Sequence, residues 1–158
     1  HRQYRYDAVL CAPNGDETVK LLVSRHDEPV YHNGSLEQPP TVHVGCTFEG
    51  KEYWGHGTDH LWMDAFADLQ RKLPTGVFLK CCLTCRHGNL CPVGNDVNEV
   101  FCTKDVLITQ KSDLFFFTVD DAERTKRSKQ YCNLCPDYQP QADGYYTYSD
   151  YLHFLKKI

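Results

Sequence analysis

Seven of the nine cysteines in this 158-residue chain fall between Cys81 and Cys135, and their spacing is the clearest chemical signal in the sequence. Two pairs have the form Cys-x-x-Cys: Cys82 with Cys85, and Cys132 with Cys135. Two intervening residues make a tight turn that presents two sulfurs to one metal ion, and two such turns complete a tetrahedral four-thiolate site. We therefore predict a metal ion bound by these two pairs.

Cys91 and Cys102 are alternative ligands. With Cys82 and Cys85 they place four thiolates within 21 residues, whereas the two paired turns enclose an insert of 46 residues. Zinc is the predicted metal, because it favours closed four-thiolate sites. An iron–sulfur cluster is the alternative, since proline follows Cys91 and Cys135 and Cys-Pro occurs at ferredoxin cluster ligands. The third interpretation is that these cysteines bind no metal.

For the other cysteines and histidines, a role other than metal binding is the simpler interpretation. Cys11, Cys46 and Cys81 lie on or beside predicted strand faces, where a free cysteine packs as a small apolar residue. His87 follows Cys85 by two residues, but a histidine there is more often a surface residue than a ligand. His56 and His60 are four residues apart, yet the helix predicted here begins after His56, so the pair does not predict a helical metal site.

The first 81 residues predict an antiparallel sheet with one helix. Apolar residues alternate at every second position along residues 4–10, 19–23 and 42–48, which is the period of a strand with one buried face. A short strand over 52–54, an amphipathic helix over 59–73 capped by Thr58 or Asp59, and a strand over 77–81 follow. Residues 25–40 contain three prolines and predict a long loop. The fold class is therefore α+β, in the order βββ(β)αβ.

Residues 82–158 predict a cysteine-rich, loop-dominated module packed as one body with residues 1–81. Short strands are expected over 106–109 and 114–119. A charged helix is expected over 120–130, because its acidic residues come first and its basic residues last. A short C-terminal helix is expected from Ser149 or Asp150 to Ile158.

Charge, hydropathy and cysteine number exclude several function classes. The net charge is −4 with no basic stripe, which counts against nucleic-acid binding. No apolar run reaches the roughly 18–20 residues of a membrane span, so no membrane association is predicted. An odd number of clustered cysteines favours metal ligation in the reducing cytoplasm over a disulfide framework.

The sequence favours a non-enzymatic protein. A closed four-thiolate site leaves no coordination position for a catalytic water, and no nucleophile or nucleotide-binding motif is present. We predict a binding or regulatory protein with a structural zinc site. Another protein is the expected partner, because aromatic residues with a polar tip are enriched at interfaces and gather near the C-terminus: Tyr138, Tyr145, Tyr146, Tyr148 and Tyr151. The alternative is a redox or sensor protein with an iron–sulfur cluster or a reactive Cys82/Cys85 pair. The sequence gives no indication of oligomeric state.

Overall fold

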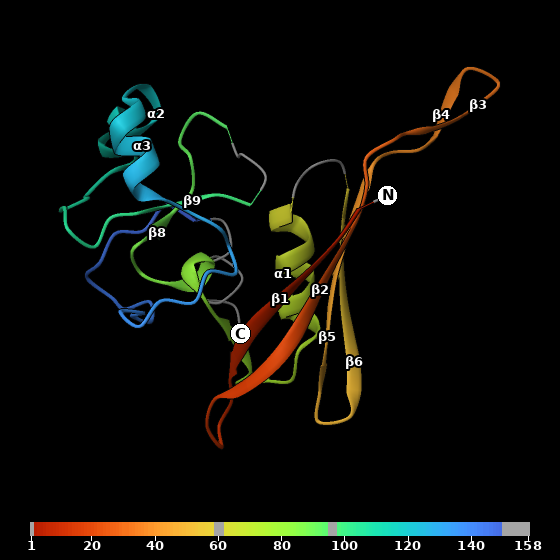
Figure 1. Ribbon diagram of the computed structural model, residues 1–158, viewed down its shortest axis with the longest axis horizontal. Coiled ribbons are helices and arrows are strands. Elements are labelled where there is room, and N and C mark those ends of the chain that lie inside the picture. The colour runs from red at the N-terminus through yellow and green to blue at the C-terminus, as the bar shows by residue number, and fades with distance from the viewer. Residues whose placement is uncertain (1, 59–61, 95–97, 150–158) are drawn as a thin grey trace. The chain divides into compact units, whose positions relative to one another are not determined.

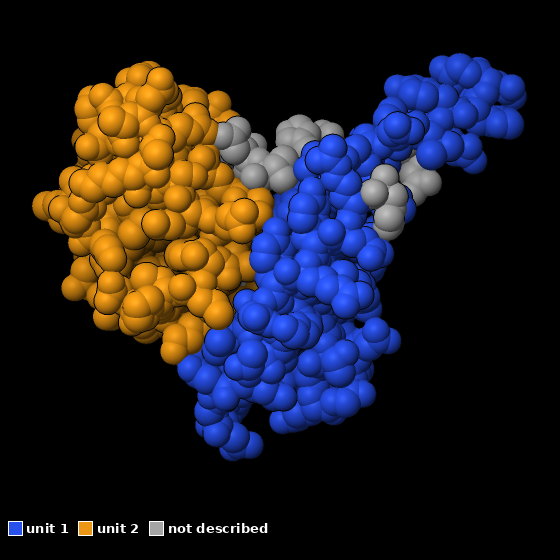
Figure 2. Space-filling model, viewed as in Figure 1, with its two compact units in different colours: residues 1–78, 158 blue, residues 79–157 orange. Residues whose placement is uncertain are grey.

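The computed structural model describes residues 2–58, 62–94 and 98–149 (Figure 1). The chain divides into two compact units, and the division falls after residue 78, where the sequence predicted it after residue 81 (Figure 2). Both helices and antiparallel strands are present, so the predicted α+β class is confirmed. The predicted C-terminal helix over 149–158 lies outside the described residues, apart from Ser149.

The first unit is built on an antiparallel sheet with the strand order β6-β5-β2-β1-β7. Its strands are β1 (Arg2–Cys11), β2 (Glu17–His26), β5 (Thr41–Phe48), β6 (Lys51–Thr58) and β7 (Phe78–Lys80). A turn closed by the hydrogen bond from Gly15 N to Ala12 O joins β1 to β2. Most of the alternating apolar residues predicted to face the core are buried, as period two requires, whereas Tyr4 and Tyr6 are half-buried. The buried ones are Ala8, Leu10, Val19, Leu21, Val23, Val42, Val44, Cys46 and Phe48.

The helix α1 (Trp62–Lys72) covers the buried face of this sheet. Its apolar stripe is fully or almost fully buried, namely Trp62, Phe66, Leu69 and the following Leu73. The helix lies very close to β6 at Gly55, where an added Cβ would stand 2.1 Å from the carbonyl oxygen of Ala65 and 2.3 Å from the nitrogen of Leu69. A glycine is therefore required at this crossing. The predicted cap Asp59 lies outside the described residues, and Thr58 ends β6.

Side chains of α1 also hold the outer edge of β6. The backbone nitrogen of His56 donates to Asp68 Oδ2 at 2.8 Å, and Lys72 Nζ donates to Trp54 O at 2.9 Å. Asp68 in turn accepts from Lys72 at 2.9 Å and from Arg71 at 2.8 Å. These hydrogen bonds lower the pKa of Asp68 to about 2, although burial alone would raise it.

Residues 25–40 were predicted to form a loop, and that prediction is wrong. Strand β2 continues to His26, and β3 (Val30–His32) and β4 (Ser35–Gln38) form a separate hairpin. Asn33 and Gly34 both have positive φ, of 52° and 79°, which is the conformation of the two-residue turn that Asn-Gly favours. The hairpin extends beyond the end of the five-stranded sheet (Figure 1).

The second unit has short elements joined by long loops, as predicted. They are the 3₁₀ turns η1 (Cys82–Thr84) and η2 (Lys111–Leu114), the helices α2 (Phe116–Val119) and α3 (Asp121–Arg127), and the three-stranded sheet β10-β9-β8 made of β8 (Gly88–Asn89), β9 (Val100–Cys102) and β10 (Ser128–Lys129). The predicted charged helix is α3, whose first turn is capped by the Asp120 carboxylate accepting from Glu123 N at 2.9 Å.

The two short strands predicted over 106–109 and 114–119 are wrong. Residues 106–109 are irregular, and 114–119 are helical. Helical winding turns Leu114 and Phe117, three residues apart, toward one cluster with Phe101 and Ile108. An extended strand would have sent these two side chains to opposite faces.

Candidate metal centre

The first Cys-x-x-Cys pair forms a rigid turn directly after β7. Cys85 N donates to Cys82 O at 3.4 Å, and Gly88 N donates to Cys85 O at 3.0 Å. The buried Thr84 hydroxyl donates to Leu79 O at 2.7 Å and accepts from the backbone nitrogen of Cys81 at 3.3 Å. These bonds stay within ten residues, so they shape the turn that carries Cys82 and Cys85 locally.

Strand pairing brings Cys102 to this turn. In the β8–β9 ladder Gly88 is the partner of Cys102, and Thr103 N donates to His87 O at 3.0 Å. Gly88 lies so close to the turn that an added Cβ would stand 1.9 Å from Cys82 O. Cys102 is therefore fixed beside the first cysteine pair, although sixteen residues lie between it and Cys85 in the sequence.

The second Cys-x-x-Cys pair meets the first through the backbone. Cys82 N donates to Asn133 O at 3.0 Å, and Leu83 N donates to Tyr131 O at 3.1 Å. The Asn133 amide nitrogen also donates to the Cys82 sulfur at 3.2 Å. At the end of this turn Asp137 N donates to the Cys135 sulfur at 3.4 Å. Hydrogen bonds to a sulfur favour its negatively charged form, which is the form that binds metal.

Three other thiols lie near that of Cys82. Burial raises the pKa of Cys82, the Asn133 amide lowers it, and the nearby thiols of Cys135, Cys85 and Cys102 raise it further. Cys82, Cys102 and Cys135 line one open pocket of about 320 Å³. Within residues 2–58, 62–94 and 98–149, no three His, Cys, Asp or Glu side chains form a group that could hold a metal ion as they stand. The sulfurs thus share one locality without being closed into a coordination shell.

Two of the six predicted ligands lie in different surroundings. Cys91 is buried in the apolar cluster with Phe101, Ile108, Leu114 and Phe117. Cys132 is 5% exposed, and burial followed by the neighbouring Cys81 thiol raises its pKa well above the usual range. Burial likewise raises the pKa of Cys81 to about 12. These environments suit neutral thiols that pack against apolar neighbours.

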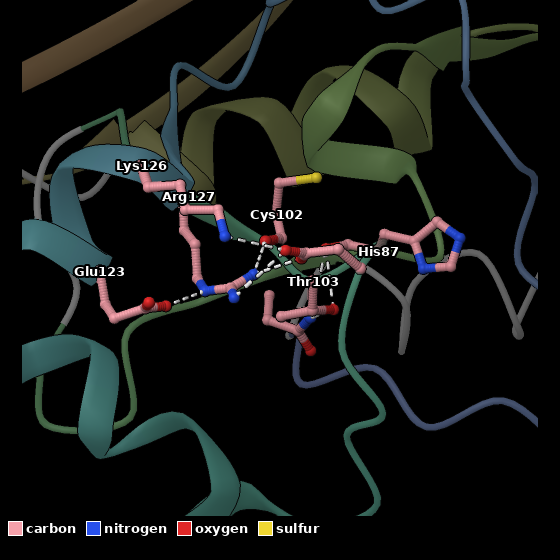
Figure 3. Close-up of polar contacts among 8 residues, drawn as sticks. His87, Cys102, Thr103, Glu123, Lys126 and Arg127 are labelled. Atoms are coloured by element: carbon pink, nitrogen blue, oxygen red, sulfur yellow. Dashed lines mark hydrogen bonds and ion pairs between the residues drawn. The ribbon is translucent and has the colours of Figure 1, made fainter.

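A buried arginine anchors the strand that carries Cys102. Arg127 at the end of α3 donates to Cys102 O at 3.1 Å, to Asp105 at 2.5 Å and to Glu123 at 2.8 Å (Figure 3). The Arg127 guanidinium and then the Lys126 ammonium hold the pKa of Asp105 well below its usual range. In Figure 3 the Cys102 sulfur points away from Arg127. The hydrogen bonds of Arg127 therefore hold the backbone of Cys102 and do not engage its thiol.

His87 lies apart from the thiols. Its ring points away from the Cys102 sulfur (Figure 3) and lines a different pocket, of about 370 Å³, together with Lys104, Leu107, Tyr145 and Tyr146. Burial, followed by the charges of Arg86 and Lys104, lowers the pKa of His87. The position of His87 therefore fits a surface residue better than a metal ligand.

Asn133 contacts the candidate site in a way that the cysteine spacing alone did not reveal. The Asn133 side-chain amide donates to the Cys82 sulfur, and its position inside the second turn is the only feature of the sequence that could have indicated this contact.

In the described part of the chain, no helix combines the length and the apolar character needed to cross a membrane. Comparison of the chain with protein-family models, with curated proteins and with solved structures finds no match in any of the three.

Proposed function

We propose that the second unit holds a structural zinc ion through Cys82, Cys85, Cys102 and Cys135. The observation that carries this proposal is that the β8–β9 ladder brings Cys102, and hydrogen bonds from Cys82 and Asn133 bring the second turn, to the turn that holds Cys82 and Cys85. Zinc would draw the four sulfurs to its tetrahedral bond length of about 2.3 Å. The set takes three ligands from the predicted paired turns and replaces Cys132 with Cys102, one of the predicted alternatives.

Electrostatics around the pocket support thiolate binding. Lys104 forms an ion pair with Asp137 at 2.9 Å, and this pair and then the thiols of Cys135 and Cys102 raise the pKa of Lys104. The Lys104 ammonium therefore places positive charge beside the sulfurs of Cys135 and Cys102. Together with the N–H groups directed at the sulfurs of Cys82 and Cys135, it offsets part of the negative charge of four thiolates.

A zinc ion here would serve folding rather than catalysis. It would join η1 and β9, each only three residues long, to the second turn, which belongs to no helix or strand. Binding free energy at such a site is largely folding free energy of the segments it joins. Four protein ligands would leave zinc no open position for a water molecule. The proposal is therefore a non-enzymatic binding or regulatory protein of the reducing cytoplasm.

The exposed apolar side chains support a protein partner. Leu107 is 83% and Val119 is 79% exposed, and further large apolar residues of the second unit are also exposed: Val93, Phe115, Phe116, Leu134 and Tyr145. Aromatic and aliphatic residues of this kind form the cores of protein interfaces. Nucleic acid is a poorer candidate, since Lys104, Lys126 and Arg127 around the thiol pocket are each engaged by a carboxylate.

A redox or sensor role is the second candidate, and the open pocket favours it. Cys82, Cys102 and Cys135 all line that pocket, so an oxidant or an iron–sulfur assembly could reach them from solvent. Protein purified under reducing conditions without chelators separates the two proposals. A colourless preparation with one zinc per chain supports the structural site, and a brown one with iron supports the cluster.

Elemental analysis of four cysteine-to-serine variants tests the ligand set. We expect Cys102→Ser and Cys135→Ser to lose the zinc, while Cys91→Ser and Cys132→Ser keep it. If the two paired turns bind the zinc instead, Cys132→Ser should lose it and Cys102→Ser should keep it. If Cys82, Cys85, Cys91 and Cys102 bind the zinc, Cys91→Ser should lose it and Cys135→Ser should keep it. Cys11→Ser, in the first unit, is the matched control. Wild-type protein that carries neither zinc nor iron would overturn the proposal.

A further inference from the structure

Three histidines of the first unit lie on neighbouring strands of the five-stranded sheet. They are His26 on β2, His43 on β5 and His56 on β6. Residues that flank His43 in the strand, Val42 and Val44, are buried, so His43 lies on the opposite face from α1. The His43 ring centroid lies 4.8 Å from that of His56 and 6.1 Å from that of His26.

Strand register explains how close His43 and His56 come. The two-residue turn Glu49-Gly50 joins β5 to β6 and makes the two histidines direct cross-strand partners. His56 N donates outward to Asp68, so the pair exchanges no backbone bond with β5 at this point. In such non-hydrogen-bonded pairs the Cα atoms approach to about 4.5 Å and the side chains are closest. The two Nδ1 atoms are 2.5 Å apart.

The contact between the two rings leaves a lone pair for a metal ion. At 2.5 Å at least one of the two Nδ1 atoms must carry no proton, because two N–H groups cannot face each other at this distance. Neutral imidazole is the ligand form of histidine, and first-row transition ions are the ions it suits.

We propose that His43 and His56 bind a divalent first-row transition ion, such as Zn²⁺ or Ni²⁺, between their Nδ1 atoms. Two nitrogens at zinc bond lengths of about 2.0–2.1 Å in a tetrahedral shell lie about 3.3 Å apart. The rings therefore separate by less than 1 Å from their present contact, which side chains on an accessible face can do by rotation about χ1 and χ2. The proton shared by the pair leaves to solvent.

His26 is the third imidazole at this site. Among the described residues, no three His, Cys, Asp or Glu side chains form a group that could hold a metal ion, so the proposed site is a two-histidine chelate whose remaining positions water would fill. The strands hold the chelate from β5 and β6, both in the first unit. It is therefore independent of the thiols of the second unit, and it differs from the His56/His60 spacing along the chain.

Nickel binding to the 158-residue chain tests the proposal. The protein is first given one equivalent of zinc, which four thiolates bind in preference to two imidazoles, in a non-thiol reductant, and Ni²⁺ is then titrated by calorimetry. We expect one Ni²⁺ beyond the zinc, with affinity weakened more than about tenfold in His43→Gln and in His56→Gln. His32→Gln, on the exposed strand β3, is the matched control and should bind as wild type does.

A protection experiment on unmodified wild-type chain gives a second readout. Ni²⁺ should slow acylation of His43 and His56 by diethyl pyrocarbonate and leave His32 unaffected, as mapped by mass spectrometry. Zinc content should be equal in wild type and in all three variants, which separates this site from the proposed thiolate site. Equal nickel affinity in His43→Gln, His56→Gln and His32→Gln would overturn the proposal, and so would equal acylation with and without Ni²⁺.

Discussion

Gly88→Ala should weaken zinc binding without touching a ligand. The new Cβ would stand 1.9 Å from Cys82 O and 3.1 Å from the Cys82 carbonyl carbon, whereas real Cβ atoms essentially never come within 3.0 Å of a neighbour. The obstructing atoms are backbone, so β8 and the first turn must separate by about 1 Å. Such overpacking costs about 1–3 kcal/mol.

This strain should appear in the metal affinity. Without metal the turn can relax away from the new methyl group, but a zinc ion that joins Cys82 to Cys102 would hold the turn against β8 and β9. At 1.4 kcal/mol per factor of ten, the affinity should fall about 10- to 100-fold. Competition for zinc against a chromophoric chelator measures the change.

Gly55→Ala is the matched control for Gly88→Ala. Its Cβ would stand 2.1 Å from Ala65 O, a clash of similar size, but in the first unit. We expect Gly55→Ala to lower the thermal stability of the first unit and to leave zinc affinity unchanged. If Gly88→Ala binds zinc as tightly as wild type, the thiolate site does not depend on the contact between Gly88 and Cys82, and the reasoning fails.

Two further predictions concern stability. Asp68→Asn should lower the free energy of unfolding by about 1–2 kcal/mol at neutral pH, because it weakens bonds to Arg71, Lys72 and the His56 nitrogen. The Asp68 pKa is depressed to about 2, so its contribution is present above the ordinary value near 3.8 and is lost as the pH falls toward 2. Urea midpoints of wild type and variant should therefore converge on acidification, and a constant difference would contradict the assignment. Thr84→Val should cost about 1–3 kcal/mol, since it leaves Leu79 O and Cys81 N without a buried partner; unchanged denaturation of the second unit would count against that role.

The sheet and helix of the first unit could be predicted because period two and the helical period were both clear. The hairpin β3–β4 was missed because prolines at 29, 39 and 40 indicated a loop more strongly than Asn33-Gly34 indicated a turn. The run Phe115-Phe116-Phe117 has the aromatic character of a strand. Its helical form follows from packing, since only Leu114 and Phe117 need burial there.

Which cysteines lie close together could be predicted from the sequence only in part. Spacing identified both turns, because local backbone bonds within each turn do not depend on the rest of the fold. The nearness of Cys102 depends on the register of β8 and β9, and the separation of Cys91 depends on an apolar cluster assembled from four distant segments. The His43–His56 pair, by contrast, follows from the Glu49-Gly50 turn once both flanking strands are extended through residues 43 and 56.

The bonds from α1 to Trp54 O and His56 N have a consequence beyond the stability of the first unit. A sheet that ends on an eight-residue strand such as β6 presents backbone donors and acceptors on which another chain can add a strand. Asp68 and Lys72 occupy two of these groups in the middle of β6. The helix that supplies apolar residues to the core thus also shields the strand edge from intermolecular pairing, and loss of either side chain would open a route to aggregation from the native state.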